Sequence, residues 1–198
     1  MRSVLIAIRT QWVNKIASGQ KTIEVRKTAP QEVPFKCYIY ETKGQYVKFT
    51  HGAHTKYGYG RGKVIGEFIC DKVHNIEPIF RFYDNYSGYD DWSDSRFLED
   101  YSIDDERLKK TCLTRRDLYI YGKEKTLYGW HISDLKIYDK PKELSEFYTI
   151  DKSGDDCCIA CVYHETPIEE MPCKTCTGER RYLYRPPQSW QYVEEVEQ

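Results

Sequence analysis

Short apolar runs separated by polar segments organise the first part of the chain. The run SVLIAI, Ser3 to Ile8, is apolar and partly β-branched and ends at Arg9, so it predicts a buried strand. In the next stretch, TQWVNKIASG, apolar residues recur at helical spacing, which predicts a helix of about two turns. We expect Thr10 to cap the start of this helix and Gly19 to end it in a left-handed conformation.

The stretch KTIEVRK, residues 21–27, alternates between polar and apolar side chains. Ile23 and Val25 point to one face of a predicted strand. The side chains that point to the other face are polar: Thr22, Glu24 and Arg26. We expect a half-buried strand whose polar face is turned to water or to a ligand. An edge strand that only displays charges to water has the same pattern, so this interpretation stays open.

The rest of the chain contains further strand and helix patterns. Two segments begin with Ser or Thr followed three residues later by Asp, an imperfect capping box, and predict helices: residues 102–113 and 114–125. The segments that predict strands are residues 37–42, 63–73, 127–141, which Pro141 ends, and 189–195. We expect an exposed loop over residues 43–62 and an irregular, acidic insertion over residues 73–106.

The order of these elements indicates the fold class. It runs strand, helix, strand and then mostly strands with helices between them, without regular alternation. This order favours an α+β fold with a mixed, largely antiparallel sheet or barrel over a doubly wound fold. With 198 residues, 40% of them hydrophobic, the chain is able to bury one sizeable core. We expect one domain with an appendage.

The N-terminal apolar run also bears on location. It is six residues long, which is too short for a signal sequence or a membrane span. We therefore expect no membrane association and a cytoplasmic location. In that reducing compartment the eight cysteines are expected to be thiols or metal ligands rather than disulfides.

Charge is unevenly distributed along the chain. The net charge of −1 argues against a protein that coats nucleic acid without specificity. Residues 1–72 nevertheless hold 13 Lys and Arg against 5 Asp and Glu, a net of +8, so the remainder carries −9. Chance clustering of surface charge is one explanation. The other is a local site for an anion such as a nucleotide or an RNA backbone.

Several segments together resemble the ASCH domain family, a branch of the PUA-like β-barrels. The most specific is G-x-K-x-x-E-x-R, met by Gly19, Lys21, Glu24 and Arg26. The segments IAIRTQW, YIYET, GKVIGEF, YGWHISDLKIYDKP and RPPQSWQYVEE extend the resemblance over roughly residues 3–150 and 184–195. It implies an α+β fold, a PUA-like, mixed, largely antiparallel β-barrel with short flanking helices and a cleft lined by the motif. It also implies RNA or nucleotide binding, with a regulatory role.

In this binding interpretation the charged residues of the cleft contact the ligand. Arg9 and Lys21 converge on a phosphate through charge-assisted hydrogen bonds. Glu24 accepts a hydrogen bond from an exocyclic amine of a base, and Arg26 orients Glu24 or contacts a second anion. The aromatic side chains available for base stacking, each equally suited to the core, are Trp12, Tyr38 and Tyr40.

The same resemblance opens an alternative function. Some ASCH proteins are amidohydrolases that remove the acetyl group from N4-acetylcytidine with the motif lysine, a threonine three residues later and a distant glutamate. Here Lys21 matches, but Glu24 stands at the threonine position. Thr22 is then a substitute nucleophile, or Glu24 activates a water while Lys21 stabilises the oxyanion. Glu67, in GKVIGEF, is our candidate for the further carboxylate.

A cysteine-rich segment near the C-terminus predicts a metal site. Two CxxC pairs are separated by eleven residues, and their members are Cys158, Cys161, Cys173 and Cys176. Paired CxxC turns supply the four soft ligands of a tetrahedral zinc. With all four ligands from the protein, the zinc is expected to be structural. Cys157 is a spare thiol or replaces Cys158, and His164 is a further alternative ligand.

These predictions divide the chain into three parts. Residues 1–150 form the ASCH, PUA-like barrel, and residues 151–183 form a zinc-stapled insertion. Residues 184–198 supply the final strand of the barrel and a C-terminal tail. A third class of function, a protein-interaction adaptor that uses the acidic segment 73–106, predicts neither RNA binding nor turnover.

Overall fold

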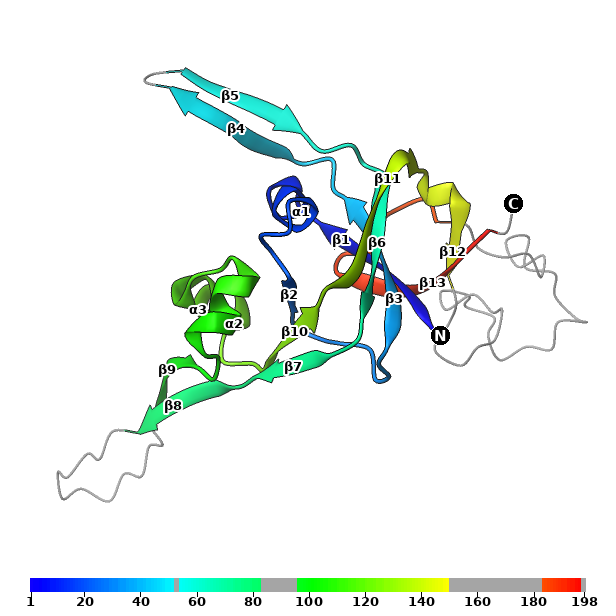
Figure 1. Ribbon diagram of the computed structural model, residues 1–198. Coiled ribbons are helices and arrows are strands. Elements are labelled where there is room, and N and C mark those ends of the chain that lie inside the picture. The colour runs from blue at the N-terminus through cyan, green and yellow to red at the C-terminus, as the bar shows by residue number, and fades with distance from the viewer. Residues whose placement is uncertain (52–53, 83–95, 150–182, 197–198) are drawn as a thin grey trace, which may run out of the picture. The chain divides into compact units, whose positions relative to one another are not determined.

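The structure of the protein is a computed structural model, which describes residues 1–51, 54–82, 96–149 and 183–196 (Figure 1). The chain separates into two compact units. Unit 1 comprises Met1–Asn14, Phe35–Ile69 and Asp134–Gln198, and unit 2 comprises Lys15–Pro34 and Cys70–Ser133. Within the described ranges, no helix combines the length and apolar composition that a membrane crossing requires.

Unit 1 is organised around the first strand, β1 (Ser3–Ile8). It lies parallel to β3 (Phe35–Glu41) on one side and antiparallel to β13 (Trp190–Glu195) on the other. The sheet continues through β6 (Val64–Cys70) and β11 (Ser133–Lys142) beyond β3, and through β12 (Phe147–Thr149) beyond β13. A central strand that is covered on both faces is apolar throughout, which is why the run SVLIAI predicts β1 correctly.

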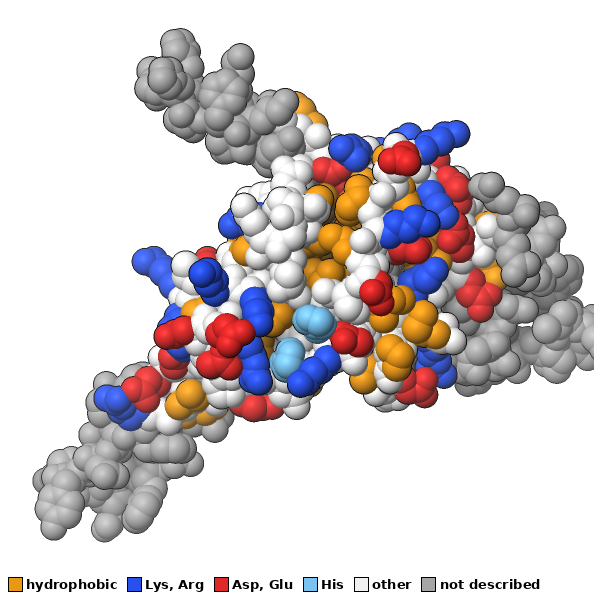
Figure 2. Space-filling view, in the orientation of Figure 1, with side chains coloured by type: hydrophobic (Ala, Val, Ile, Leu, Met, Phe, Trp, Pro, Cys, Tyr) orange, Lys and Arg blue, Asp and Glu red, His pale blue; other side chains and the backbone are white. Residues whose placement is uncertain are grey.

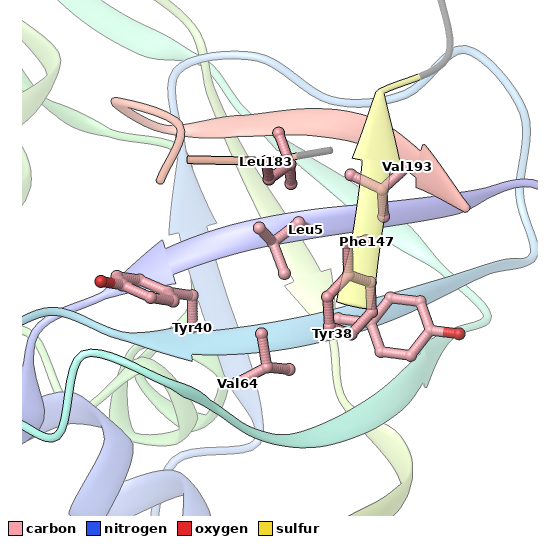
Figure 3. Close-up of a cluster of buried hydrophobic side chains, with 7 residues drawn as sticks. All are labelled: Leu5, Tyr38, Tyr40, Val64, Phe147, Leu183 and Val193. Carbon is pink, nitrogen blue, oxygen red and sulfur yellow. The ribbon is translucent and has the colours of Figure 1, made fainter. Parts of the chain in front are cut away.

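The core of unit 1 gathers on one face of this sheet. It consists of Leu5, Tyr38, Tyr40, Val64, Phe147, Leu183 and Val193 (Figure 3). The rings of Tyr38 and Phe147 meet edge to face with centroids 4.8 Å apart, a favoured arrangement for two aromatic side chains. Leu183 brings the chain back to the core just before β13, so this last strand is held by packing as well as by its ladder with β1.

Unit 2 contains the strand that carries the G-x-K-x-x-E-x-R motif, β2 (Ile23–Arg26). It pairs antiparallel with β10 (Leu127–His131), which pairs with β7 (Val73–Ile76) on its other side. A separate hairpin joins β8 (Pro78–Phe82) and β9 (Arg96–Tyr101). Two short helices follow, α2 (Asp105–Thr111) and α3 (Arg115–Gly122). The core of the unit comprises Val25, Ile76, Leu98, Tyr101, Ile103, Leu118 and Leu127.

The predicted fold class is confirmed. The described elements are α+β, with short helices and mixed, largely antiparallel sheets. The described strands do not close into a barrel. They form one six-stranded, one three-stranded and two two-stranded sheets, and the six-stranded sheet ends at β11 and β12 without joining them. The predicted domain boundaries near residues 150 and 183 flank a segment outside the described residues and stay predictions.

Two segments expected to be irregular contain strands. Residues 43–62 hold an antiparallel hairpin of β4 (Gln45–His51) and β5 (His54–Tyr59), because QYVKFTH and HTKYGY supply β-branched and aromatic residues between their glycines. Residues 73–106 hold β7, β8 and β9. High polarity and glycine content therefore hid these strands, of which β4 and β5 and also β8 and β9 pair as local hairpins, whereas β7 pairs with the distant β10.

The sequence predicts the N-terminal caps of three helices, and the structure confirms one of them. Thr114 and Asp117 form the reciprocal capping box of α3 as predicted. The cap of α2 is Asp104, whose carboxylate accepts from the Arg107 amide at 2.8 Å, rather than Ser102. In α1 (Thr10–Ala17), Thr10 is the first helical residue and not the cap, since the first hydrogen bonds of the helix end on the Arg9 carbonyl.

Candidate functional site: the Lys21–Glu24–Arg26 cluster

The polar face of β2 is buried, contrary to the expectation that it is turned to water or a ligand. The exposed fractions of Lys21, Glu24 and Arg26 are 2%, 6% and 8%. The reason is tertiary. Alternation along the strand sets which side chains share a face, but here α2 packs against β2 and covers the charged face as well. The G-x-K-x-x-E-x-R motif thus forms a buried charged cluster.

Lys21 is held by three acceptors. Its Nζ donates to the Thr111 carbonyl at 2.6 Å and to the Ile23 carbonyl at 2.9 Å, and it lies 3.2 Å from Glu24 Oε2. An ammonium group has three N–H donors, so each has an acceptor within reach. Thr111 is the last residue of α2, where the carbonyls carry the negative end of the helix dipole and favour a cation. This arrangement fixes the position of the Lys21 ammonium group.

Glu24 lies between two cations. Its Oε2 faces Lys21 and its Oε1 lies 3.1 Å from Nε of Arg26. Both carboxylate oxygens are therefore engaged in ion pairs within a buried site. Ion pairs of this kind offset the cost of desolvating the charges only when the geometry satisfies the partners.

Tyr121 of α3 extends the cluster beyond Arg26. Burial raises the pKa of its hydroxyl, and the Arg26 guanidinium opposes this by lowering that pKa through its charge and a hydrogen bond. Lys27 Nζ lies 4.9 Å from the centroid of the Tyr121 ring, within cation–π range. The phenol therefore stays neutral. Tyr121 is the member of the cluster that α3 contributes.

Contacts with backbone groups tie the start of the motif to α2. Gly19 follows α1 with φ of +72°, a conformation that glycine adopts without steric cost, and this turn leads the chain toward α2. There the Thr22 amide donates to the Lys110 carbonyl at 3.0 Å, and Cys112 Sγ donates to the Gln20 carbonyl at 3.4 Å. The segment between Gly19 and β2 is thus tied to the end of α2.

Some partners of the charged cluster lie outside the motif, and sequence patterns do not predict them. The lysine meets the carbonyl of Thr111, which is 90 positions away, and a backbone carbonyl leaves no mark on residue type. Tyr121 is one of 18 tyrosines, and nothing in its local pattern separates it from the others. Neither partner has a sequence signal that a single chain would reveal.

Four of the other predicted site residues, Arg9, Trp12, Tyr40 and Glu67, belong to unit 1, whereas Thr22 belongs to unit 2 and is half-buried. Arg9 is exposed, and no carboxylate of the described residues lies within salt-bridge distance of it. Trp12 is half-buried on α1, whereas Tyr40 is 3% exposed and packs in the core. Of the two interpretations for Tyr40, the core one thus has direct structural support.

Glu67, the predicted further carboxylate, is a hydrogen-bond acceptor inside unit 1. Its Oε2 accepts from the Tyr138 hydroxyl at 2.6 Å and lies 3.5 Å from Lys36 Nζ. The pKa of Tyr138 is raised, chiefly by burial and then by the hydrogen bond and charge of Glu67. Glu67 thus links β6, β3 and β11 of the six-stranded sheet.

The predicted zinc ligands Cys158, Cys161, Cys173 and Cys176 lie outside the described residues, so the zinc site stays a prediction. Elsewhere in the described ranges, no group of three His, Cys, Asp or Glu side chains is placed to hold a metal. Cys37 and Cys70 are fully buried free thiols, as expected for core cysteines. Burial raises the pKa of Cys70 to about 12, which keeps this thiol protonated and unreactive.

Comparison with known proteins gives a structural likeness only. No family model matches the chain, and no curated protein matches it. The chain is similar to the crystal structure of ASCH from Zymomonas mobilis, with 14% identity, 99% of each chain covered and a TM-score of 0.49. A crystal structure of a mutant of that protein matches with 13% identity over 98% of this chain and 91% of the other, also with a TM-score of 0.49. At this identity and TM-score the likeness does not assign the chain to a family.

Proposed function

We propose that the chain is an RNA- or nucleotide-binding module of the ASCH, PUA-like type. In this proposal the Lys21–Glu24–Arg26 cluster supports the framework of unit 2, and exposed basic side chains meet the phosphates of the ligand. The proposal takes its family from the G-x-K-x-x-E-x-R motif and its flanking segments. It takes its ligand class from the net charge of +8 over residues 1–72.

The observation that carries the choice of binding over hydrolysis is the geometry of Lys21. All three of its N–H groups have acceptors within the cluster. To stabilise an oxyanion, Lys21 would have to give up one of these acceptors in a site that is 2% exposed. Glu24 is likewise engaged with two cations, so both of its carboxylate oxygens already lie in ion pairs. The cluster is therefore better suited to holding structure than to amide hydrolysis.

The surface charge favours a local binding site over a broad one. Basic and acidic side chains are interspersed on the face drawn in Figure 2. Among the described side chains on this face, interspersed charges of both signs do not build up an extended positive field that would attract nucleic acid at random. Single basic groups without a neighbouring carboxylate, such as Arg9, are the ones available to a phosphate. We expect few phosphate contacts per bound ligand.

Two readouts on one preparation of the full chain test the proposal. The first is the fluorescence anisotropy of a labelled single-stranded RNA, and the second is the release of cytidine from N4-acetylcytidine. We expect RNA binding that weakens with salt, and no release of cytidine. Cytidine release that is lost in both Lys21→Ala and Glu24→Ala, with the folded state preserved in each, would replace the binding module with an amidohydrolase. Absence of both activities would favour the adaptor interpretation.

A further inference from the structure

A pocket of about 540 Å³ opens on unit 1, beside the end of β3. Its size lies in the range of small-molecule sites, about 300 to 1,000 Å³. Apolar side chains form part of its wall, and the polar or aromatic groups that line it are Tyr40, Thr42, Lys43, Glu143, Ser145 and Tyr184. The mixture of one cation, one carboxylate, two hydroxyls and two phenols is suited to an amphipathic, aromatic ligand.

The backbone is shaped to place Lys43 at this pocket. Gly62 has φ of +68°, and a Cβ there would lie 2.4 Å from both Cγ and Cε of Lys43. The missing side chain therefore leaves room for the stem of Lys43 to lie across the backbone. Gly62 is fixed in turn by its amide, which donates to the Glu41 carbonyl at 3.0 Å. Within the described part of the chain, Lys43 has no carboxylate at salt-bridge distance, so its charge is available to an anion.

Two tyrosines give the pocket its aromatic surface. Tyr184 is 86% exposed, although an aromatic ring of this size normally gains free energy by burial. Tyr40 is anchored in the core, and its hydroxyl points away from Leu5 and Val64 (Figure 3). A base can stack on an exposed aromatic side chain of this kind, which gives Tyr184 a ligand-dependent role.

Glu143 supplies an acceptor at the same pocket. Its side chain is 55% exposed, and Oε1 pairs with Lys63 Nζ at 2.6 Å. A carboxylate held by one cation keeps lone pairs that can accept from an exocyclic amine, as acidic side chains do with cytosine. A base with a carbonyl in place of the amine would instead set an oxygen against this negative charge. Glu143 thus favours amino-bearing bases.

We infer that this pocket binds a single nucleotide with an amino-bearing base, with its phosphate on Lys43, its base on Tyr184 and its amine on Glu143. The inference rests on the proposed function, because it names the nucleotide subsite of the same module. It adds residues that the G-x-K-x-x-E-x-R motif does not contain. The nucleotide is either free or part of an RNA strand, and the two sources present the same phosphate and base.

The test is calorimetric titration of the full chain with cytidine 5′-monophosphate, cytidine and uridine 5′-monophosphate. We expect cytidine 5′-monophosphate to bind more tightly than either of the others. Lys43→Ala and Tyr184→Ala should each raise its Kd by about tenfold, since each removes one contact of the size of a charged hydrogen bond or a stacked base. The matched controls are Lys140→Ala, another exposed lysine, and Tyr119→Ala, whose tyrosine is 50% exposed, and both should leave the Kd unchanged.

The outcomes separate this inference from the proposed function. If the chain binds labelled RNA but no nucleotide, or if Lys43→Ala and Tyr184→Ala behave like their controls, the pocket is not the nucleotide site and the RNA-binding module stands. If neither RNA nor nucleotide binds, both are overturned. Where nucleotide binding is found, displacement of labelled RNA by cytidine 5′-monophosphate identifies an RNA nucleotide as the occupant. Lack of displacement identifies a free nucleotide, and both results support the pocket.

Discussion

Replacing Glu24 with alanine is expected to lower the free energy of unfolding by about 3 to 5 kcal/mol. The carboxylate separates Lys21 and Arg26, and both cations are at most 8% exposed. Without Glu24, two like charges would stay buried with no anion between them. Urea denaturation followed by tryptophan fluorescence measures the change, provided that the slope against urea is unaltered.

The matched control is Glu106→Ala on α2. Glu106 also pairs with a lysine, Lys110, at 2.6 Å, but its side chain is 80% exposed. An exposed ion pair at this helical spacing contributes roughly 0.5 kcal/mol or less. If Glu24→Ala were no more destabilising than Glu106→Ala, the buried cluster would not support unit 2, and its structural role would be wrong.

Replacing Gly60 with alanine is expected to cost about 3 kcal/mol, the upper end of the usual range for overpacking. A Cβ at this position would lie 1.7 Å from the Thr42 carbonyl oxygen and 2.6 Å from Thr10 Oγ1. The carbonyl belongs to backbone that is itself fixed, because the Thr42 amide donates to the Ile8 carbonyl at 3.0 Å. The new methyl group can therefore be accommodated only by moving backbone. The same urea titration measures the loss.

Gly44→Ala is the control for this second substitution. A Cβ at Gly44 would meet only Thr42 Oγ1, at 3.9 Å, which is an ordinary contact. Its effect should stay within about 0.5 kcal/mol of zero, as for most surface substitutions. Equal free energies of unfolding for the two variants would contradict this prediction. They would show that the backbone at Gly60 and the Thr42 carbonyl move apart without cost.

Sequence patterns predict elements whose signals are local. The apolar run of β1, the capping box of α3 and the alternation of β2 all rest on residues within one turn or strand, and each element is present. Alternation also places Glu24 and Arg26 on one face correctly. It does not predict that α2 covers this face, because burial of a strand face depends on elements distant in the sequence.

The candidate site shows the same limit. The motif identifies the three charged residues, but their partners include the Thr111 carbonyl, which is 90 positions from Lys21. The pocket of unit 1 combines residues near positions 40, 62, 143 and 184, and no spacing rule connects them. The glycines of YGYGRGK, which include Gly62, predict only a loop from the sequence. The role of Gly62 follows only from the structure, in which the Lys43 side chain lies against it.

The most direct test of the binding module is the salt dependence of its RNA affinity. The logarithm of the binding constant for a single-stranded RNA should fall linearly with the logarithm of salt concentration, with a slope of about −0.7 for each phosphate contact. Arg9→Gln, which removes an exposed basic group of unit 1, should make this slope less steep by about 0.7, and Lys140→Gln should leave it unchanged. An affinity that does not respond to salt, or the absence of RNA binding at low salt, would contradict the proposed function.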